Sequence, residues 1–280
     1  MTQSTSRDLQ DALDARYRDA PPVDDHIRDT APLVTMAGRG SYRKFLTTPV
    51  PEPLLDVLCA TALSSPSKSD LQQRDIVVMA SPEKRRQLAE LVSGQDWVVE
   101  APVLLVFCGN NRRQKLLHDW SGVPFANDHL DAFFNAAADA AIALATFVTA
   151  AESQGLGCCP ISAIRNDAQA VANLLQLPDR VFPFAGLAVG YPASPPAISM
   201  RLPLAITYHK NTYTEENLER SIPAYDADRK NAQPYASQRY TEDFGTSDHY
   251  TWSEDKTRQY SRPEREDFGA FVRKAGFNLK

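Results

Sequence analysis

The sequence predicts an α+β domain, in which helices of unequal length pack on a sheet, with a polar segment at each end. Three observations lead to this fold class. Short apolar runs that suit buried strands alternate with longer stretches of helical apolar spacing. These elements follow no regular βαβ period, which favours a mixed, layered α+β arrangement. The chain of 280 residues, 43% hydrophobic and 23% charged, has a globular composition and the length to bury a substantial core.

The first part of the chain is expected to add helices and strands to a polar lead. Roughly the first thirty residues form this lead, with a possible helix at 8–18 that the Pro21-Pro22 pair would end. Proline in the first turn and inward-facing leucines predict a helix at 51–63. A polar, turn-rich loop, SSPSKSDLQQ, follows it. The next predicted elements are a strand at 75–80, an amphipathic helix at 82–92 and a buried strand at 101–108.

The longest predicted element is an alanine-rich helix at 128–153. Its many small residues imply close packing of neighbouring helices, either within the chain or across an oligomer. We expect Gly155 and Gly157 to end it. A short strand then leads to a helix at 166–175, and the run VFPFAGLAVGY at 181–191 predicts another apolar strand.

The composition shifts after the RLP segment at 201–203. Residues 208–280 are rich in Tyr, Asp, Arg and Ser, with few apolar runs before 268–277. Such a segment lacks the apolar residues for a core of its own, so we expect it to wrap over the body or over a partner subunit. The sequence therefore predicts an N-terminal extension at 1–35, a main domain at 36–203 and a C-terminal extension at 204–280.

Charge and hydropathy exclude some classes of protein. A net charge of −5 and a pI near 5.6 argue against a nucleic-acid binder, so any bound anion must be held by a few local donors. No apolar run approaches the length of about 18 residues that a membrane span needs. The N-terminus lacks the pattern of a signal peptide. We therefore expect a cytoplasmic protein that contacts neither nucleic acid nor membrane.

The cysteines and histidines show no metal-site spacing. Cys59 and Cys108 lie in apolar runs, and the adjacent pair Cys158-Cys159 is not a CxxC motif. We expect all of them to be structural, because free cysteine usually packs as a small core residue. The five histidines are scattered along the chain, and we expect no metal.

A basic loop and a later arginine form a candidate phosphate site. Arg39, Ser41 and Arg43 precede a predicted helix, and Arg165 stands directly before another. The planar guanidinium matches phosphate geometry, and the backbone N–H groups of a helix start favour an anion. These residues could therefore hold one phosphate together. The alternative is that the arginines pair with surface carboxylates, and the residues alone do not decide between the two.

The SSPSKSDLQQ loop is crowded with hydrogen-bonding groups, which could bind the edge of a flat heterocycle. A solvated turn would have the same composition. GxGxxG and P-loop motifs are absent from the sequence, which disfavours a dinucleotide-binding Rossmann site or an NTPase. A GxSxG motif is also absent, so an unassisted hydrolase has little to work with.

The order of several segments resembles the nitroreductase superfamily. The segments are RGSYRKF, SPSKSDLQ, SGQDWVVEAPVLLVFC, AAESQGLGCCPISAIRND, LLQLPDRVFPFAGLAVGYP and RLP. The chain is most similar to the oxygen-insensitive nitroreductases and NAD(P)H:flavin oxidoreductases of the larger, C-terminally extended group. The resemblance is close over residues 36–203 and weaker through the tail to TWSED.

The resemblance implies a nitroreductase-like fold, with a central mixed, mostly antiparallel sheet flanked by helices. It also implies a homodimer with FMN at the interface. We expect the alanine-rich helix to be the dimer element and the C-terminal extension to embrace the partner subunit.

The resemblance also implies cofactor-binding residues. The basic loop matches the segment that binds the flavin phosphate, and the serine loop matches the one that contacts the isoalloxazine. A further residue contacts the flavin, a segment closes over the cofactor and its phosphate, and another reaches it from the other subunit. In that order the matching residues are Arg39, Gly40, Ser41, Tyr42 and Arg43; Ser67, Lys68, Ser69 and Gln72; Gln95; Ala163, Ile164 and Arg165; and Phe125, Ala126 and Asn127. Asp70 departs from the pattern, because relatives often carry asparagine there and an ionised carboxylate can only accept hydrogen bonds.

The implied activity needs no catalytic dyad among the side chains. FMN would take a hydride at N5 from NADPH or NADH and pass reducing equivalents to a small acceptor such as a nitroaromatic, by a ping-pong mechanism. Lys68 or Arg74 could add positive charge near the flavin, and Arg201 matches a residue that holds the nicotinamide nucleotide. Asp248 and its neighbours stand where relatives carry arginines, which leaves the choice of NADPH open. The alternatives are a flavin or quinone reductase of the same fold, or a flavin-binding protein without hydride-transfer turnover.

Overall fold

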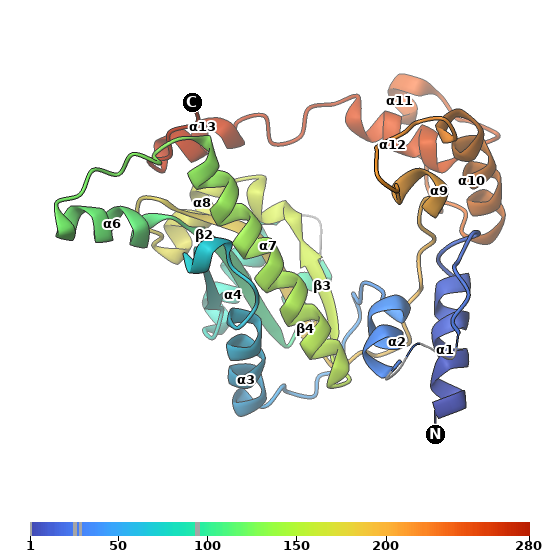
Figure 1. The fold of residues 1–280 in the computed structure, drawn as a ribbon, viewed down its shortest axis with the longest axis horizontal. Coiled ribbons are helices and arrows are strands. Elements are labelled where there is room, and N and C mark those ends of the chain that lie inside the picture. Colours follow the sequence, from blue (N-terminus) through green and yellow to red (C-terminus); the bar gives the residue numbers. More distant parts are fainter. Residues whose placement is uncertain (1, 25–26, 28–29, 93–95) are drawn as a thin grey trace. The chain divides into compact units, whose positions relative to one another are not determined.

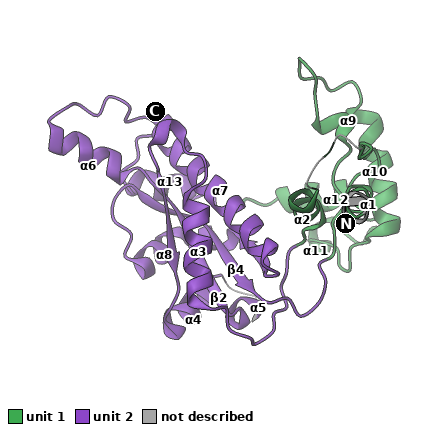
Figure 2. Cartoon of the chain, turned by 60° about the horizontal axis from the view of Figure 1, so that its bottom comes forward, with its two compact units in different colours: residues 1–40, 197–264 green, residues 41–196, 265–280 purple. Residues whose placement is uncertain are grey.

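The computed structural model describes residues 2–24, 27, 30–92 and 96–280. The chain forms two compact units, which are coloured separately in Figure 2. Unit 1 consists of residues 1–40 and 197–264, and unit 2 consists of residues 41–196 and 265–280. This division places the N-terminal segment and most of the C-terminal extension in one unit. The domain boundaries drawn from composition stay a prediction.

Unit 2 is built on a four-stranded sheet in the order β1-β2-β4-β3. Its strands are β1 (Arg74–Val78), β2 (Val103–Asn110), β3 (Gly157–Ile161) and β4 (Val181–Gly190). We expected a mixed, mostly antiparallel sheet, and the pairings among the described strands are all antiparallel.

The pairing of β2 with β4 contains an irregularity. Phe107 stands opposite Ala185, whereas Cys108 stands opposite Pro183, so that Phe184 is an extra residue on β4. Proline has no backbone N–H to give to a ladder, and a bulge is one of the few places in a sheet where it fits.

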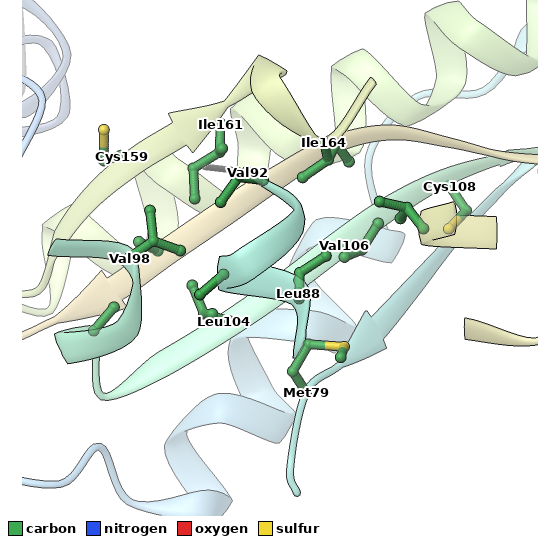
Figure 3. Packing of buried hydrophobic residues seen from close by; sticks show 14 of the residues in the cluster. Met79, Leu88, Val92, Val98, Leu104, Val106, Cys108, Cys159, Ile161 and Ile164 are labelled. Carbon is green, nitrogen blue, oxygen red and sulfur yellow. The ribbon is translucent and has the colours of Figure 1, made fainter. Parts of the chain in front are cut away.

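Helices cover both faces of this sheet (Figure 1). Leu105 and Phe107 of β2 face α3 (Glu52–Leu63) and α7 (Leu130–Ser153), where they pack with Leu58 and Phe147. The alternate residues of β2 face the other way, because successive side chains of a strand point to opposite faces. They pack against α4 (Pro82–Leu91), α5 (Asp96–Glu100) and α8 (Ala168–Leu175) in the cluster drawn in Figure 3.

A third apolar cluster of unit 2 lies at the start of β4. Phe271 of helix α13 (Phe268–Lys274) and Phe277, which follows this helix, pack with Phe182, and the ring centroids of Phe182 and Phe277 lie 5.5 Å apart. The remaining elements of this unit are the short helices η1 (Lys68–Asp70) and η2 (Ser162–Arg165) and the helix α6 (Arg112–Ser121).

Helix α7 confirms the predicted long helix. Its alanines, such as Ala136, Ala140 and Ala143, are fully buried and let the helix approach the sheet closely. By length and composition alone it could cross a membrane, but a core helix passes the same test, and α7 also buries the charged Asp139. Gly155 follows it with a φ of +75°, whereas Gly157, which we expected to help end the helix, belongs to β3.

Unit 1 is helical. Its elements are α1 (Thr2–Asp14), α2 (Ala31–Gly38), α9 (Leu204–Thr207), α10 (Leu218–Ala232), α11 (Thr241–Phe244) and α12 (Trp252–Tyr260). The helix expected at 8–18 therefore starts and ends earlier. Polar and aromatic groups share the interior of this unit, because Arg258 is 4% exposed and its guanidinium lies over the rings of Phe244 and Tyr250. The same guanidinium donates to the carbonyl oxygens of Arg239 and Gly245.

A buried carboxylate organises this polar interior. Asp255 is 2% exposed, accepts a hydrogen bond of 2.9 Å from the Tyr250 hydroxyl and lies 2.7 Å from the Lys256 ammonium. Burial acts to raise the pKa of Asp255, but the hydrogen bonds from Lys256 and Tyr250 and the charge of Arg239 outweigh it and hold the pKa below its ordinary value.

We predict that Asp255 makes unit 1 sensitive to acid. A carboxyl group with a lowered pKa stabilises the fold above its ordinary pKa, and this contribution is lost as the pH falls through the lowered value. Asp255→Asn should therefore be less stable than the wild type near neutral pH, and the two proteins should converge in acid. Urea unfolding of both proteins between neutral pH and pH ~2 tests this. Parallel stability curves across that range would contradict it.

Candidate functional site

The basic loop runs along one end of β3 and β4. The Tyr42 N–H donates to the Cys158 carbonyl at 3.1 Å, and the Leu46 N–H donates to the Tyr191 carbonyl at 2.8 Å. The Tyr42 ring lies directly on Gly157, where a Cβ atom would come within 2.5 Å of the ring. Only glycine at this position leaves room for the aromatic ring.

The polar side chains of this loop in unit 2 are free to meet a ligand. Ser41 and Arg43 are exposed, and the Arg43 guanidinium lies 5.8 Å from the centroid of the Trp97 ring. Arg39 and Gly40 belong to unit 1, where Arg39 donates to the Gly40 carbonyl at 3.0 Å. Gln95, which the sequence also assigned to the flavin, lies outside the described residues.

The serine loop is held by one carboxylate of α7. Asp139 is 1% exposed and accepts hydrogen bonds from the Ser67 hydroxyl at 2.7 Å, the Lys68 N–H at 3.1 Å and the Gln73 N–H at 2.8 Å. The Ser67 oxygen in turn accepts from the Gln72 N–H at 2.7 Å. These bonds close the loop at both ends and leave its tip exposed.

The backbone of the exposed tip is unusual for its residue types. Ser69, Asp70 and Gln72 have φ angles of 48°, 57° and 51°, a region that residues other than glycine rarely adopt. Asp70 accepts a hydrogen bond of 3.0 Å from the Gln72 amide, and the Lys68 ammonium donates to Ser69. Such strain persists only where surrounding contacts fix the loop, and it is concentrated at functional sites.

Arg74, one of the two cations that the sequence offered for charge near the flavin, is buried and contacts groups of its own chain. It is 5% exposed, lies 3.7 Å from the Asp139 carboxylate and donates to the carbonyl oxygens of Leu63 and Ser65. Lys68 is the exposed cation of this loop.

The segment Ser162–Arg165 follows the other end of β3. Ile164 is 1% exposed and its side chain belongs to the core, so that a ligand could meet only its backbone. Ala163 is half-buried and packs against the same cluster.

The Arg165 side chain supplies a hydrogen bond to the bulge in β4. It donates to the carbonyl of Phe184, the extra residue of the bulge, and its guanidinium lies about 6 Å from the rings of Phe184 and Phe268. Burial and then the nearby Arg265 lower the pKa of Arg165. The sequence did not reveal this role, because it depends on a strand irregularity.

The two ends of β3 separate residues that we expected to share one phosphate. Tyr42 pairs with Cys158 at the start of β3, whereas Arg165 lies beyond its last residue, Ile161. That Arg43 and Arg165 hold one phosphate together stays a prediction.

The antiparallel order of the sheet gives Arg165 other neighbours. The start of β4, the end of β2 and the start of β1 lie at one end of the sheet, whereas Ile161, the last residue of β3, pairs with Gly186 in the middle of β4. The serine loop leads into β1 at this end, and Ser162–Arg165 leaves β3 in its direction, where Arg165 donates to Phe184.

The segment expected from the partner subunit is partly anchored in its own chain. The Phe125 ring lies 5.0 Å from the His118 ring and 5.5 Å from the Arg180 guanidinium. Arg180 is held in turn by Asp128 through hydrogen bonds of 3.0 and 2.7 Å. The next residues, Ala126 and Asn127, are exposed.

Unit 1 contains two cavities that meet at Arg201. One, of about 460 Å³, is lined by mainly apolar residues of the first 37 positions together with Arg16, Arg39 and Arg201. The other, of about 310 Å³, is lined by Arg18, Arg201 and Arg220 among others. Arg201 is exposed and donates to the Ser199 hydroxyl at 2.6 Å.

The segment around Asp248, where relatives carry arginines for the nucleotide, offers other groups in this structure. Tyr250 is 8% exposed, and its hydroxyl donates its hydrogen bond to the Asp255 carboxylate rather than to a phosphate. Lys230 of α10, which sequence reasoning missed, donates to the Asp248 carbonyl at 3.2 Å and lies 3.0 Å from His249. This cation is distant in sequence, and only the helical packing reveals it.

The described residues contain no cluster of three or more His, Cys, Asp or Glu side chains that could hold a metal ion. All four cysteines are thiols rather than members of a disulfide. Burial, and then Asp75, raises the pKa of Cys108 to about 12, which keeps it a thiol rather than a nucleophilic thiolate.

We predict that Asp139→Ala destabilises the protein strongly. The change leaves two loop N–H groups without their acceptor and the buried Arg74 without its countercharge, a loss of about 3–5 kcal/mol in the free energy of unfolding. Urea unfolding measures it. Asp131→Ala is the matched control, because Asp131 is an exposed carboxylate on the same helix and should cost less than about 1 kcal/mol. Equal losses in the two variants would contradict the prediction.

Comparison with known proteins agrees with this architecture. The model of the Nitroreductase family matches residues 36–191, and that of the Nitroreductase family C-terminal domain matches residues 199–280. Residues 1–35 lie outside both.

Two curated relatives illustrate the similarity. FMN reductase [NAD(P)H] of Bacillus subtilis is 34% identical over 253 residues, which cover 89% of this chain and 98% of the relative. Oxygen-insensitive NADPH nitroreductase of Salmonella typhimurium is 33% identical over 191 residues, which cover 68% of this chain and 78% of the relative.

Solved structures show the same fold. NfrA2 of B. megaterium superposes with a TM-score of 0.81 at 31% identity and covers 89% of this chain and 99% of its own. NADPH:FMN oxidoreductase from Vibrio harveyi, complexed with NAD⁺, has a TM-score of 0.76 at 28% identity and covers 88% and 98%. The antiparallel sheet covered by helices on both faces, the C-terminal helices and the matches to both family models together establish that this chain belongs to the nitroreductase family.

Proposed function

We propose that this protein is an FMN-dependent oxidoreductase that uses NADPH or NADH to reduce a small acceptor such as a nitroaromatic. Membership of the nitroreductase family over both of its segments carries the proposal. The names of the relatives, FMN reductase and NADPH nitroreductase, agree with it.

We place the elongated cofactor FMN against the two candidate loops. FMN carries its phosphate and its ring system at opposite ends. We assign the phosphate end to the exposed Ser41 and Arg43, together with Arg39, Gly40 and Tyr42 before and between them. The cradle fits this assignment, because Gly157 omits the side chain that would displace Tyr42.

We assign the ring end to the serine loop with Ser67, Lys68, Ser69 and Gln72, which leads into the start of β1. We propose that Ala163, Ile164 and Arg165 close over the cofactor and its phosphate, while the Arg165 side chain also donates to the Phe184 carbonyl. Gln95 and the segment Phe125–Asn127 complete the proposed set.

Bound FMN would supply hydride acceptance from NAD(P)H and delivery of reducing equivalents, which we propose to be ping-pong. The chain would supply binding and electrostatics. Arg43 would neutralise the phosphate charge, and the exposed Lys68 ammonium would favour added negative charge on the ring. The serine loop would hold the ring edge, because Asp139 fixes its backbone before any ligand arrives.

The homodimer is part of the proposal. Helices α3 and α7 expose large apolar side chains, including Val57 at 61%, Phe134 at 64% and Leu130 at 50%. A second copy that packs on these helices would cover such side chains. We propose that the C-terminal extension embraces the partner and that the dimer works in the cytoplasm, without nucleic acid or membrane.

The identity of the electron acceptor distinguishes a nitroreductase from a flavin or quinone reductase of the same fold. A flavin or quinone reductase would turn over free FMN or quinones faster than nitroaromatics, and steady-state rates with the purified protein distinguish these versions. A flavin-binding protein without turnover is a different class. It would stay yellow under anaerobic NADH and NADPH, and bleaching under either would exclude it.

We predict that Arg43→Ala weakens FMN binding through the phosphate. The loss of a charge-assisted contact should raise the Kd for FMN by about tenfold or more. Binding of riboflavin, which lacks the phosphate, should change little. Fluorescence titration of the flavin-free protein measures both.

The control for this prediction is Arg86→Ala. Arg86 is exposed in the same unit and pairs with Glu90 at 3.9 Å, far from the basic loop in sequence. If Arg43→Ala binds FMN as tightly as Arg86→Ala does, Arg43 is not a phosphate ligand.

We predict that the nicotinamide preference is weak. Asp248 and the buried Tyr250 provide no charge for the 2′-phosphate of NADPH, and Arg201 alone should favour NADPH by about tenfold or less. Anaerobic stopped-flow reduction with NADH and NADPH measures this ratio. A preference for NADPH of about a hundredfold or more would show that other cations, with Lys230 the first to test, bind the nucleotide.

A further inference from the structure

An arginine in the first turn of α6 holds the end of the serine loop. The Arg113 guanidinium donates to the Gln72 carbonyl at 2.5 Å and to the Arg74 carbonyl at 3.0 Å. It also pairs with the Asp75 carboxylate at 2.8 Å. One planar side chain, which offers several donors in a fixed arrangement, thus fixes the last part of this loop and the first residues of β1.

The neighbours of Arg113 complete this contact. The Gln114 amide donates to the Leu71 carbonyl at 2.8 Å, and the Asn110 N–H donates to the Gln73 carbonyl at 2.9 Å. Each of the four successive carbonyl groups from Leu71 to Arg74 therefore accepts a hydrogen bond from the segment 110–114. These bonds continue the pairing of β1 with β2 beyond its last pair, Arg74 and Gly109.

The N–H groups of the same segment have other partners. The Gln72 N–H donates to the Ser67 hydroxyl oxygen, and the Gln73 N–H donates to the Asp139 carboxylate. The loop thus gives its donors to Asp139 and to the hydroxyl that Asp139 holds, and its acceptors to α6. Gln72 has both its N–H and its carbonyl bonded and a φ of 51°, a conformation that persists only where such contacts fix it. These contacts set the direction of its exposed side chain.

We propose that Arg113 and Gln114 are positioning residues for the ring end of the FMN site, acting through the backbone of Leu71 and Gln72. The inference rests on the proposed function, because it assumes that the serine loop holds the flavin ring. All of the groups concerned lie in unit 2. A loop that is fixed before the cofactor arrives loses less conformational freedom on binding, which raises affinity.

Two other roles for Arg113 make different predictions. A residue that only stabilises the junction of β2 and α6 lowers the Tm of the flavin-free protein and leaves the flavin affinity of the folded protein unchanged. A residue that acts only by its charge can be replaced by lysine without loss. A charge directed at the phosphate would also affect FMN and leave riboflavin, which has no phosphate, unchanged.

The experiment measures the Kd of flavin-free protein for FMN and for riboflavin by fluorescence titration. The variants are Arg113→Met, Arg113→Lys and Gln114→Met. Methionine removes the donors in each case, whereas lysine keeps the charge but lacks the planar fork that reaches two carbonyl groups. Gln114→Met changes no charge, so it tests the position of the loop alone.

The matched control is Lys115→Met. Lys115 is a cation of the same helix and pairs with Asp119, one turn further along α6. Far-ultraviolet circular dichroism and the Tm of the flavin-free protein show whether each variant is folded. Visible circular dichroism at saturating flavin reports the surroundings of the bound ring.

We expect Arg113→Met to raise the Kd for both flavins by about tenfold, and Arg113→Lys and Gln114→Met to raise both by about threefold. The ratio of the two Kd values should stay at its wild-type value, because the phosphate end is unchanged. The visible circular dichroism of the bound flavin should change in the same variants, and Lys115→Met should match the wild type. If Arg113→Met does not fold, Gln114→Met carries the test.

Wild-type affinity for both flavins in the folded variants would overturn the inference, whatever their Tm. A loss confined to FMN would overturn it too, as would full replacement of Arg113 by lysine, because either result shows the effect of a charge. Failure of the wild type to bind either flavin would instead overturn the proposed function. The two failures are therefore distinguishable.

Discussion

The hydrogen bonds to the Asp139 carboxylate are the interactions on which the candidate site depends. An isolated carboxylate at this depth would cost several kcal/mol, and only a full set of donors makes its burial tolerable. The donors come from Ser67, Lys68 and Gln73, and Arg74 supplies the countercharge. The serine loop has little apolar surface of its own, so its position relative to helix α7 depends on the hydrogen bonds to this carboxylate. The strained backbone at the loop tip is held for the same reason.

The sheet places the two candidate loops at opposite ends. The serine loop leads into the start of β1, beside the end of β2 and the start of β4. The basic loop lies beside Gly157, which pairs with Gly190 at the end of β4. Strand β3 ends between them, because Ile161 pairs with Gly186 in the middle of β4.

The elements that the sequence predicted well are those with dense apolar patterns. The strand expected at 101–108 is β2 at Val103–Asn110, the helix at 128–153 is α7 at Leu130–Ser153, and the helix at 51–63 is α3 at Glu52–Leu63. Their side chains fill the core on both faces of the sheet, and burial alone specifies them.

Local pattern failed where polar contacts between distant segments decide the structure. The C-terminal extension was expected to lack a core of its own. In the structure Asp255, Arg258 and Tyr250 form a polar interior, which the apolar pattern of the sequence does not predict. The pairing of Arg74 with Asp139 joins positions 65 residues apart, and the bulge that engages Arg165 follows from a proline on one strand and its register with another. Among the candidate residues, the sequence therefore identified the segments better than the roles of individual side chains.

The arginines show most clearly why residue type alone could not decide the function. Arg16, Arg74, Arg165 and Arg258 all donate to backbone carbonyl oxygens, at a helix end, a loop, a bulge and a turn. The guanidinium suits this task because it is planar, carries five donors and stays charged when buried. A protein with net negative charge thus uses many of its cations to satisfy backbone acceptors that water cannot reach. The exposed Arg43 is different, because its guanidinium rests on the Trp97 ring and keeps its donors available. Whether an arginine serves the fold or a ligand depends on which acceptors the fold leaves unpaired, and that is a property of the tertiary structure.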